Sequence, residues 1–378
     1  MKVFVIAGEP SGDALGGAVM AGLSELAPGV QFEGVGGPLM QAQGLVSLFD
    51  MDELSVMGLA EVLPKYRALK RRIAQCADAV IAAQPDVLLT IDSPDFCLRV
   101  AKLVKARSDI RTIHYVAPTV WAWRPGRAAK MAGHIDHVLA LFPFEPPLMQ
   151  AAGMTCDFVG HPVAAQLVAT DAEVAAFRAV HDLGDAPLVL ALPGSRKGEV
   201  TRLASRFDGA LELLKQTKAN IRVVVPYAGP VEDLVREVTA DWPGQPILIA
   251  PDDAAAKRAA FRAADVALAA SGTVSLELAA SDTPMVIAYD MNWLSTQIIA
   301  RMLLVDTVTL VNLVSDSRTV PEFIGEDCTS SRIADGLRAV LADPYAQRDA
   351  MALTMDRLGR GGEAPGLRAA RSVLSHVR

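Results

Sequence analysis

The chain has 378 residues, of which 51% are hydrophobic, and this is enough apolar side chain to form the cores of two domains. Its formal net charge of −7 argues against nucleic acid as a partner, because nucleic-acid-binding proteins normally carry a basic excess. The four cysteines match neither a zinc spacing nor a small disulfide framework, and they fit a reducing cytosol. No uncharged apolar run approaches the roughly 18 residues of a membrane-spanning helix.

A short apolar run, Val3–Ala7, predicts a buried strand at the start of the chain. The glycine-rich stretch Gly8–Asp13 turns this strand into a helix that runs to about Leu26. Ligands usually bind at the carboxyl edge of a parallel sheet, where this loop lies. We therefore predict a ligand-facing loop; the alternative is a tight strand-to-helix turn. The residues concerned are Glu9, Ser11, Gly12 and Asp13.

Residues 56–73 predict a basic amphipathic helix. Its apolar positions, at helical spacing, are Val62, Leu63, Tyr66, Leu69 and Ile73. Its positive charges are Lys65, Arg67, Lys70, Arg71 and Arg72. Such a helix suits the interface of an anionic bilayer, with its apolar face buried and its cations among the head groups. The alternative is a surface helix whose apolar stripe covers its own domain.

Asp92 follows a predicted buried strand, residues 86–91, and Asp95 opens the helix after it. A carboxylate is favoured near a helix N-terminus, which gives Asp95 a structural role. Asp92 has no such role, and its place at the end of a strand makes it a candidate general base. Trp121, Trp123 and Arg124 share a later loop, where the aromatic rings either stack on sugar or pack beneath the loop.

The alternation of strands and helices lapses between Pro162 and about Ala172, which predicts a domain boundary, and then resumes. Leu188–Leu192 reads as a strand, followed by a loop with Gly194, Ser195 and Arg196 before a helix. Small residues and cations at such an edge favour an anion. Arg196 is the better candidate for a bidentate phosphate contact, whereas Lys197 is compatible with simple solvation.

A second strand-to-helix junction lies at Ser271, Gly272 and Thr273, between a predicted strand, Val266–Ala270, and a predicted helix, Val274–Ala280. The free N–H groups and dipole of the helix attract a diphosphate there. Glu277 lies one helical turn further along, where a carboxylate can accept from the two hydroxyls of a ribose. This arrangement is typical of a nucleotide-sugar site; the alternative is an ordinary capped helix with a solvated Glu277.

The chain has no P-loop sequence and no regular Gly-x-Gly-x-x-Gly, so a P-loop nucleotide triphosphatase and a dinucleotide-dependent oxidoreductase are disfavoured. His114, His134, His137 and His161 form no recognisable ligand set. We therefore expect neither a metal nor a cofactor.

Seven segments, in order, make the chain resemble the lipid-A-disaccharide synthase family of GT-B glycosyltransferases, and the resemblance extends to VPEFIGEDCT at 320–329. The segments are AGEPSGD at 7–13, VMGLAEVL at 56–63, IDSPDF at 91–96, IHYVAPTVWAWRPGR at 113–127, FVGHP at 158–162, LPGSR at 192–196 and SGTVSLE at 271–277. The resemblance implies an α/β fold of two doubly wound, Rossmann-like domains that face each other across a cleft. We expect an acceptor and membrane-facing domain at 1–165, a UDP-sugar donor domain at 166–345, and C-terminal helices at 346–378 that return to the first domain.

The resemblance also implies a reaction in which 2,3-diacylglucosamine moves from UDP to 2,3-diacylglucosamine 1-phosphate, with inversion. Asp92 matches the family's candidate base, and Arg196 is expected to offset charge on the leaving diphosphate. The donor residues it implies are Gly194, Ser195, Arg196, Ser271, Gly272, Thr273, Glu277 and Asn312. Glu9, Ser11, Gly12 and Asp13 are expected on the acceptor side.

Because both implied substrates carry acyl chains, the resemblance favours membrane contact by Val62, Leu63, Tyr66, Leu69, Lys70 and Arg71. It places the protein in the cytoplasm of a Gram-negative cell, peripheral on the inner membrane, and is compatible with a homodimer. Three alternatives stay open: a GT-B transferase for a UDP-sugar without acyl chains, a UDP-sugar 2-epimerase, and a non-catalytic nucleotide-binding protein.

Overall fold

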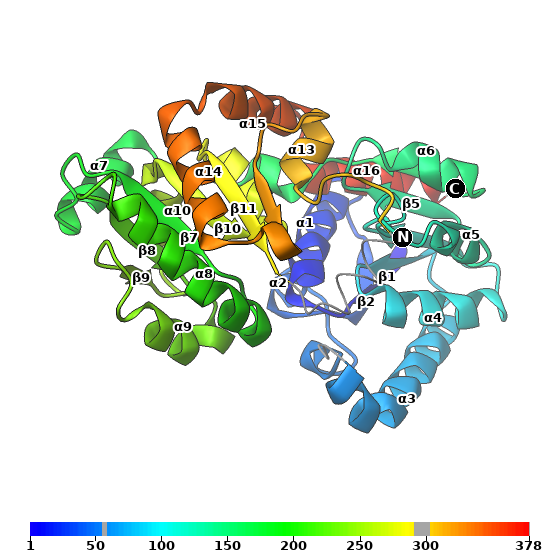
Figure 1. Ribbon diagram of the computed structural model, residues 1–378. Helices are drawn as coiled ribbons and strands as arrows, with labels where there is room; N and C mark the ends of the chain where they lie inside the picture. The colour runs from blue at the N-terminus through cyan, green and yellow to red at the C-terminus, as the bar shows by residue number, and fades with distance from the viewer. Residues whose placement is uncertain (55–58, 291–302, 378) are drawn as a thin grey trace. The chain divides into compact units, whose positions relative to one another are not determined.

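The chain divides into two compact units in a computed structural model (Figure 1). The structure describes residues 1–54, 59–290 and 303–377, and for residues 59–66 it describes the backbone alone. Unit 1 comprises residues 1–165 and 361–378, and unit 2 comprises residues 166–360. Each unit holds one sheet and its own apolar core.

The sheet of unit 1 is parallel and has six strands in the order β2-β1-β3-β4-β5-β6. Its strands are β1 (Lys2–Ala7), β2 (Gln31–Val35), β3 (Val87–Ile91), β4 (Arg111–Tyr115), β5 (His137–Ala140) and β6 (Thr155–Phe158). Every residue of β3, with the sequence VLLTI, is buried. Apolar side chains on both faces are typical of a parallel strand with helices on either side.

The helices of unit 1 flank this sheet. They are α1 (Pro10–Leu26), α2 (Pro38–Gln41), α3 (Leu59–Ala83), α4 (Pro94–Lys105), α5 (Gly126–Ala132), α6 (Pro146–Ala151), α16 (Pro365–His376) and the 3-10 helices η1 (Met51–Glu53) and η2 (Pro162–Ala165). The red α16 lies along the blue α1 in Figure 1. Small residues permit this approach, since a Cβ on Gly22 would lie 2.9 Å from the Cβ of Ala370.

Unit 2 repeats the architecture with the strand order β12-β11-β10-β7-β8-β9, again all parallel. The strands are β7 (Leu188–Leu192), β8 (Arg222–Pro226), β9 (Ile247–Ile249), β10 (Val266–Ala270), β11 (Met285–Tyr289) and β12 (Glu322–Ile324). The helices are α7 (Asp171–Val180), α8 (Lys197–Lys215), α9 (Glu232–Thr239), α10 (Ala254–Ala263), α11 (Val274–Ala280), α13 (Leu310–Ser315), α14 (Ser330–Ala342), α15 (Tyr345–Arg357) and the 3-10 helices η3 (Gly229–Val231) and η4 (Gly325–Asp327).

The division differs from the expected domains at one helix. We expected residues 346–378 to return to the first domain, but α15 belongs to unit 2, where it packs on α11 and α13. The buried side chain of Gln347 holds it there: the amide oxygen accepts from the N–H of Met285 at 2.5 Å, and the amide nitrogen donates to the Met285 carbonyl at 3.0 Å. Only α16 joins unit 1.

Each strand order contains one point where the direction of winding reverses. In unit 1 the chain proceeds outward from β1 to β2 and then continues on the other side of β1 with β3. In unit 2 it proceeds from β7 to β8 and β9, and then continues on the other side of β7 with β10. Ligands bind at such switch points, beyond the carboxyl ends of the strands. The described helices include none that is long and apolar enough to cross a membrane.

Candidate active site

The switch point of unit 1 brings Ser11 and Asp92 together. Ala7, the last residue of β1, pairs with Ile91, the last residue of β3, so the segments that follow are neighbours. Because α1 starts at Pro10, Ser11 lies in its first turn, and its Oγ donates to Oδ2 of Asp92 at 3.2 Å. Asp92, the predicted base, is half-exposed. Its carboxylate is held by a hydroxyl from an adjacent element.

A strained turn displays Asp92 at the sheet edge. Asp92 and Ser93 have φ angles of 52° and 41°, in the left-handed region that non-glycine residues adopt at a cost of about 1 to 3 kcal/mol each. The N–H of Asp92 donates to the carbonyl of Tyr115 at 2.9 Å, which fixes the turn to β4. A Cβ on Gly8 would lie 2.7 Å from Ser93 Oγ, so glycine lets the first loop approach. Backbone strain of this kind is typical of functional sites.

Two residues of the opening loop depart from the expectation that they face a ligand. The Asp13 side chain is only 3% exposed, and its carboxylate accepts from the N–H groups of Gly37, Leu39 and Met40 at 2.8, 2.9 and 3.0 Å. Gly12 is buried, and a Cβ there would lie 3.3 Å from the carbonyl oxygen of Ile91. Both are structural, since Asp13 fixes the start of α2 and Gly12 lets α1 approach β3. Glu9 is half-exposed at the N-cap of α1.

In unit 2 the loop after β7 is organised around Glu199, to which the sequence pattern assigned no role. Gly194 has a φ of 120°, and a Cβ there would lie 2.6 Å from the Glu199 side chain, so the position requires glycine. The carboxylate of Glu199 accepts from the N–H of Ser195 and from Nη1 of Arg196, both at 3.1 Å. The Arg196 side chain is 63% exposed and stands at the N-cap of α8.

The loop after β10 lies beside the first, because Ala269 of β10 pairs with Leu192, the last residue of β7. Thr273 is the N-cap of α11, but its side chain makes no capping bond. Apart from Gly272 itself and its two neighbours in the chain, no described residue has an atom within 4 Å of the place where a Cβ of Gly272 would be, so the backbone is open to a ligand. The two loops thus bring the N-termini of α8 and α11 to one edge of the sheet, where both helix dipoles attract an anion.

Glu277 is not simply solvated, which was the alternative for this position. One carboxylate oxygen accepts from Nζ of Lys257 at 2.8 Å, and Lys257 also lies over the ring of Phe261, 5.1 Å from its centroid. Lys257 comes from α10, and nothing in the local sequence links it to Glu277. The pair is partly exposed, so the carboxylate is both oriented and accessible.

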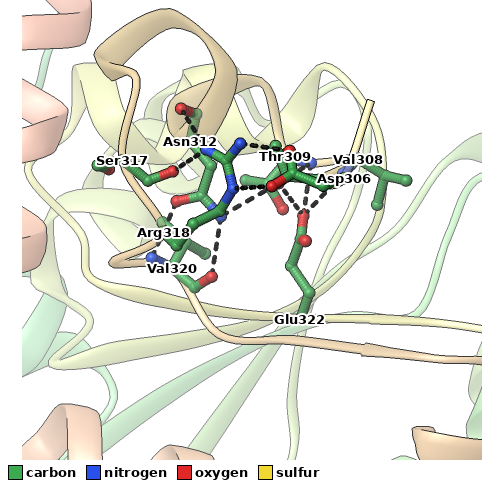
Figure 2. A network of polar contacts seen from close by, with 9 residues as sticks. Asp306, Val308, Thr309, Asn312, Ser317, Arg318, Val320 and Glu322 are labelled. Atoms are coloured by element: carbon green, nitrogen blue, oxygen red, sulfur yellow. Dashed lines mark hydrogen bonds and ion pairs between the residues drawn. The ribbon is translucent and has the colours of Figure 1, made fainter. Parts of the chain in front are cut away.

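Asn312 lies inside a buried polar network (Figure 2). Its amide nitrogen donates to the carbonyl of Val320 at 3.0 Å and to Oγ1 of Thr307 at 3.3 Å, while its amide oxygen accepts from the N–H of Val320 at 3.0 Å. These bonds use the side chain within the protein. Asn312 therefore differs from the other predicted donor residues, since it supports the segment around it.

The same network includes groups for which the sequence pattern predicted no role. Glu322 accepts from Oγ1 of Thr307 at 2.8 Å and from the N–H of Thr309 at 2.6 Å, and Arg318 pairs with Asp306 (Figure 2). These contacts join residues that are 12 to 15 positions apart. No helix or strand period in the sequence predicts them.

The two tryptophans of the loop after β4 have different surroundings. The ring of Trp121 meets Phe142 and Phe144 edge-on at 6.2 and 5.3 Å, and its Nε1 donates to buried Glu145 at 3.2 Å, which is the packing alternative. Burial raises the pKa of Glu145 to about 7. Trp123 is partly exposed, with the guanidinium of Arg124 4.3 Å from its ring centroid.

The predicted membrane residues are described in part. The side chains of Val62, Leu63 and Tyr66 lie outside the described residues. Leu69 is half-buried against the core of unit 1, which agrees with the alternative of a stripe that covers its own domain, whereas Lys70 and Arg71 are exposed.

One group of described side chains has the spacing of metal ligands. His137, Asp157 and His376 each place a ligand atom within 4.8 Å of the others. The two imidazole rings are stacked, however, with centroids 3.6 Å apart, and a ring binds a metal in its own plane, so these rings do not converge on one ion. His137 instead donates or accepts at both nitrogens, with Thr155 at 2.8 Å and with Ser372 of α16 at 3.0 Å. The group anchors the last helix to the sheet.

Comparison with solved structures identifies the class of fold. The chain is similar to UDP-GlcNAc 2-epimerase from Neisseria meningitidis bound to UDP-GlcNAc, with a TM-score of 0.66, 11% identity and 99% of both chains covered. It is also similar to the Methanocaldococcus jannaschii UDP-GlcNAc 2-epimerase in complex with UDP-GlcNAc and UDP, with a TM-score of 0.61, 12% identity and 99% of both chains covered. At this identity the likeness concerns the fold, and it confirms the predicted GT-B architecture of two Rossmann-like domains.

Sequence comparison then identifies the family. Residues 3–363 match the family described as lipid-A-disaccharide synthetase. A lipid-A-disaccharide synthase of Ruegeria pomeroyi is 64% identical, with 100% of this chain and 96% of the relative covered, and one of Rhodospirillum centenum is 46% identical, with 100% and 95% covered. The chain belongs to this family, as its sequence segments predicted, and it is a glycosyltransferase.

Proposed function

We propose that the chain transfers 2,3-diacylglucosamine from its UDP conjugate to 2,3-diacylglucosamine 1-phosphate, with Asp92 as the general base. The observation that carries this assignment is the turn at the switch point of unit 1, which displays a half-exposed carboxylate on two left-handed residues. Among the described contacts, the Asp92 carboxylate accepts a hydrogen bond from Ser11, which orients it, and its partial exposure makes it accessible to a substrate hydroxyl.

The reaction exchanges one bond at the anomeric carbon of the donor. The acceptor 6-hydroxyl oxygen forms a bond to that carbon, the bond from the carbon to the diphosphate oxygen breaks, and its electron pair leaves with UDP. Asp92 takes the proton of the attacking hydroxyl. Attack from the face opposite the leaving group inverts the configuration and gives a β-1,6 linked disaccharide 1-phosphate.

Unit 2 supplies the groups that we assign to UDP. Arg196 and the N–H groups around Ser271 to Thr273 offset the charge that develops on the leaving diphosphate. Glu199 holds Arg196 before the nucleotide binds, with Gly194 giving it room. Ser271 lies in the second loop, beside the diphosphate. Glu277, oriented by Lys257, accepts from the ribose hydroxyls, and Asn312 positions the segment next to the donor rather than touching it.

We place the acceptor beside Glu9 and Ser11, which are half-exposed and exposed respectively. Gly12 and Asp13 hold this part of the acceptor side from beneath. Because both substrates are acylated, we propose that the protein acts peripherally on the cytoplasmic face of the inner membrane, with the exposed Lys70 and Arg71 towards anionic head groups, beside Leu69 and the predicted Val62, Leu63 and Tyr66. A homodimer stays a prediction, which the mass of the protein in solution tests.

The deciding experiment supplies the two acylated sugars and measures UDP and the disaccharide. We expect Asp92→Asn to bind UDP normally while transfer falls about 100-fold or more, because the amide cannot take a proton. Asp95→Asn is the matched control, since Asp95 lies three residues further on with a side chain that is 88% exposed. Full transfer by Asp92→Asn refutes the assignment, and a 2-epimer of a UDP-sugar as the product refutes the transferase.

A further inference from the structure

The outer face of unit 1 contains an open groove between α3 and α4, which lie side by side (Figure 1). We call it the basic groove; it is lined by Arg67, Lys70, Arg71, Ile73, Ala74, Arg99, Lys102 and Leu103. Its volume is about 930 Å³, within the range of pockets that hold a small ligand.

Helical periodicity explains why cations gather in this groove. In α4 the residues Phe96, Cys97, Val100, Ala101 and Val104 are buried against the core. Arg99, Lys102 and Leu103 therefore occupy the opposite face, three to four residues apart. In α3 the residues Arg67, Lys70, Arg71 and Ala74 follow the same spacing.

Among the described residues, no acidic side chain lines the basic groove and none of its five cations forms an ion pair. Cations just outside it are paired: Arg72 with Glu53 at 2.6 Å, Lys105 with Asp136 at 2.7 Å and Arg107 with Asp78 at 2.6 Å. An unbalanced positive cluster in a chain of net charge −7 generates a local field that attracts an anion.

The groove also has apolar walls, which a simple anion does not need. Exposed Ala74 and the largely buried Ile73 contribute from α3, and Leu103 contributes from α4 with 39% of its surface exposed. A ligand that satisfies both kinds of contact has a negative head and a hydrocarbon tail.

We propose that the basic groove binds an anionic glycerophospholipid, with its phosphodiester among the cations and the start of an acyl chain along Ile73 and Leu103. The groove lies on the helix faces directed away from the sheet, whereas Asp92 lies at the end of β3. In this proposal the lipid is a bound membrane component and not the reacting acceptor. The inference rests on the proposed membrane contact, which shares Lys70 and Arg71, and it adds a discrete site with α4 as its second wall.

The test compares two double variants that each remove two positive charges from unit 1. Arg99→Gln with Lys102→Gln changes the groove, and Arg107→Gln with Lys130→Gln changes cations outside it. Binding is measured by flotation with phosphatidylcholine vesicles that contain about 30% phosphatidylglycerol, and by calorimetry with dihexanoyl phosphatidylglycerol. We expect the groove variant to bind the vesicles about tenfold more weakly or worse and the control to change less than threefold.

The other outcomes separate the rival explanations. Equal losses in both variants overturn the proposal in favour of diffuse attraction, and undiminished binding by the groove variant overturns it outright. Inorganic phosphate that binds as tightly as the short-chain lipid makes the groove a small-anion site, which also overturns it. Leu103→Ser keeps every charge and should weaken lipid binding alone. Transfer between detergent-dispersed substrates should be normal in all these variants, so a failure of the proposed reaction is distinguishable.

Discussion

The two units share one sheet design but hold their functional residues in different ways. Unit 1 displays Asp92 on a strained turn that hydrogen bonds fix on two sides, whereas unit 2 presents Arg196 on a mostly exposed side chain that Glu199 holds. A proton acceptor must meet a hydroxyl within hydrogen-bond distance, so a fixed carboxylate suits it. A long cation can adapt to a diphosphate whose charge changes during the reaction. In the proposed reaction, the fixed carboxylate would serve proton transfer and the adaptable cation would serve the leaving diphosphate.

The units also differ in buried ionisable groups. Of the six histidines in the chain, only His181 lies in unit 2. In unit 1, burial lowers the pKa of His114 to about 3 and the pKa values of His137 and His161 to about 4. Those rings are neutral in the folded state over most of the acid range. Unit 1 should therefore depend on pH more strongly than unit 2.

The largest expected effect is a selective loss of stability in unit 1 on acidification. The folded pKa values of these histidines lie below the unfolded value of about 6.5, so their contribution is complete above pH 6.5 and is lost as the pH falls towards 4. Between pH 7 and pH 5, each of these three histidines lowers the free energy of unfolding by about 2 kcal/mol. Glu145 offsets this loss by about 2 kcal/mol, because its raised pKa makes the folded state take up a proton at a higher pH than the unfolded state does. We expect unit 1 to lose about 4 kcal/mol in all.

Hydrogen exchange followed by mass spectrometry, corrected for intrinsic rates, measures each unit separately. Protection of β4 and β5 should fall between pH 7 and 5 while that of β7 and β10 is retained. Glu145→Gln should steepen the loss, and His181→Gln in unit 2 should leave it unchanged. Equal losses in the two units would contradict the comparison.

The second effect concerns the buried carboxylate under the acceptor side. Asp13→Ala leaves three backbone N–H groups without their acceptor, and we expect unit 1 to lose about 3 kcal/mol of its free energy of unfolding. Urea unfolding measures this loss, with the exposed Asp95→Ala as its control. UDP affinity should be unchanged, since the donor residues belong to unit 2. A loss below 0.5 kcal/mol would contradict the structural role of Asp13 and would favour the prediction that its side chain faces a ligand.

The strands at both switch points could be predicted from sequence because parallel strands are apolar on both faces. β7, β10 and α11 begin and end at the residues predicted for them. The helix starts were predicted less well: the sequence pattern predicts a helix from about Val200, whereas α8 begins at Lys197. Helix termini depend on local hydrogen bonds as much as on periodicity.

The partners of the site residues could not be predicted, because tertiary contacts supply them. Asp13 meets Gly37 across 24 positions, Glu277 meets Lys257 across 20, and Gln347 meets Met285 across 62. No period of helix or strand relates such positions. Glu199 is the exception, because it lies only three residues after Arg196, a spacing at which side chains meet on a helix and which could have indicated the ion pair.

The third prediction tests the adaptable cation of unit 2. Arg196→Ala should weaken UDP binding about 30-fold, which is the size expected for the loss of a charge-assisted phosphate contact. Isothermal titration calorimetry measures it, and Lys197→Ala is the control because Lys197 is the adjacent, exposed cation. If the two variants bind UDP equally well, Arg196 does not contact the diphosphate.

The smallest effect should come from Lys257, which orients Glu277 without touching the nucleotide in our proposal. The ion pair is 44% exposed on the lysine side and 32% on the glutamate side, and exposed pairs contribute about 1 kcal/mol or less. Lys257→Met should therefore weaken UDP binding about fivefold at most, which is the factor that corresponds to that energy. Glu277→Gln should do more, and it should also reduce the preference for UDP over 2′-deoxy-UDP, since a carboxylate accepts from the ribose hydroxyls better than an amide does. Calorimetry with both nucleotides distinguishes the roles. An unchanged preference in Glu277→Gln would show that this carboxylate only joins α10 to α11 through Lys257. The nucleotide site of unit 2 would then consist of the two helix N-termini and Arg196.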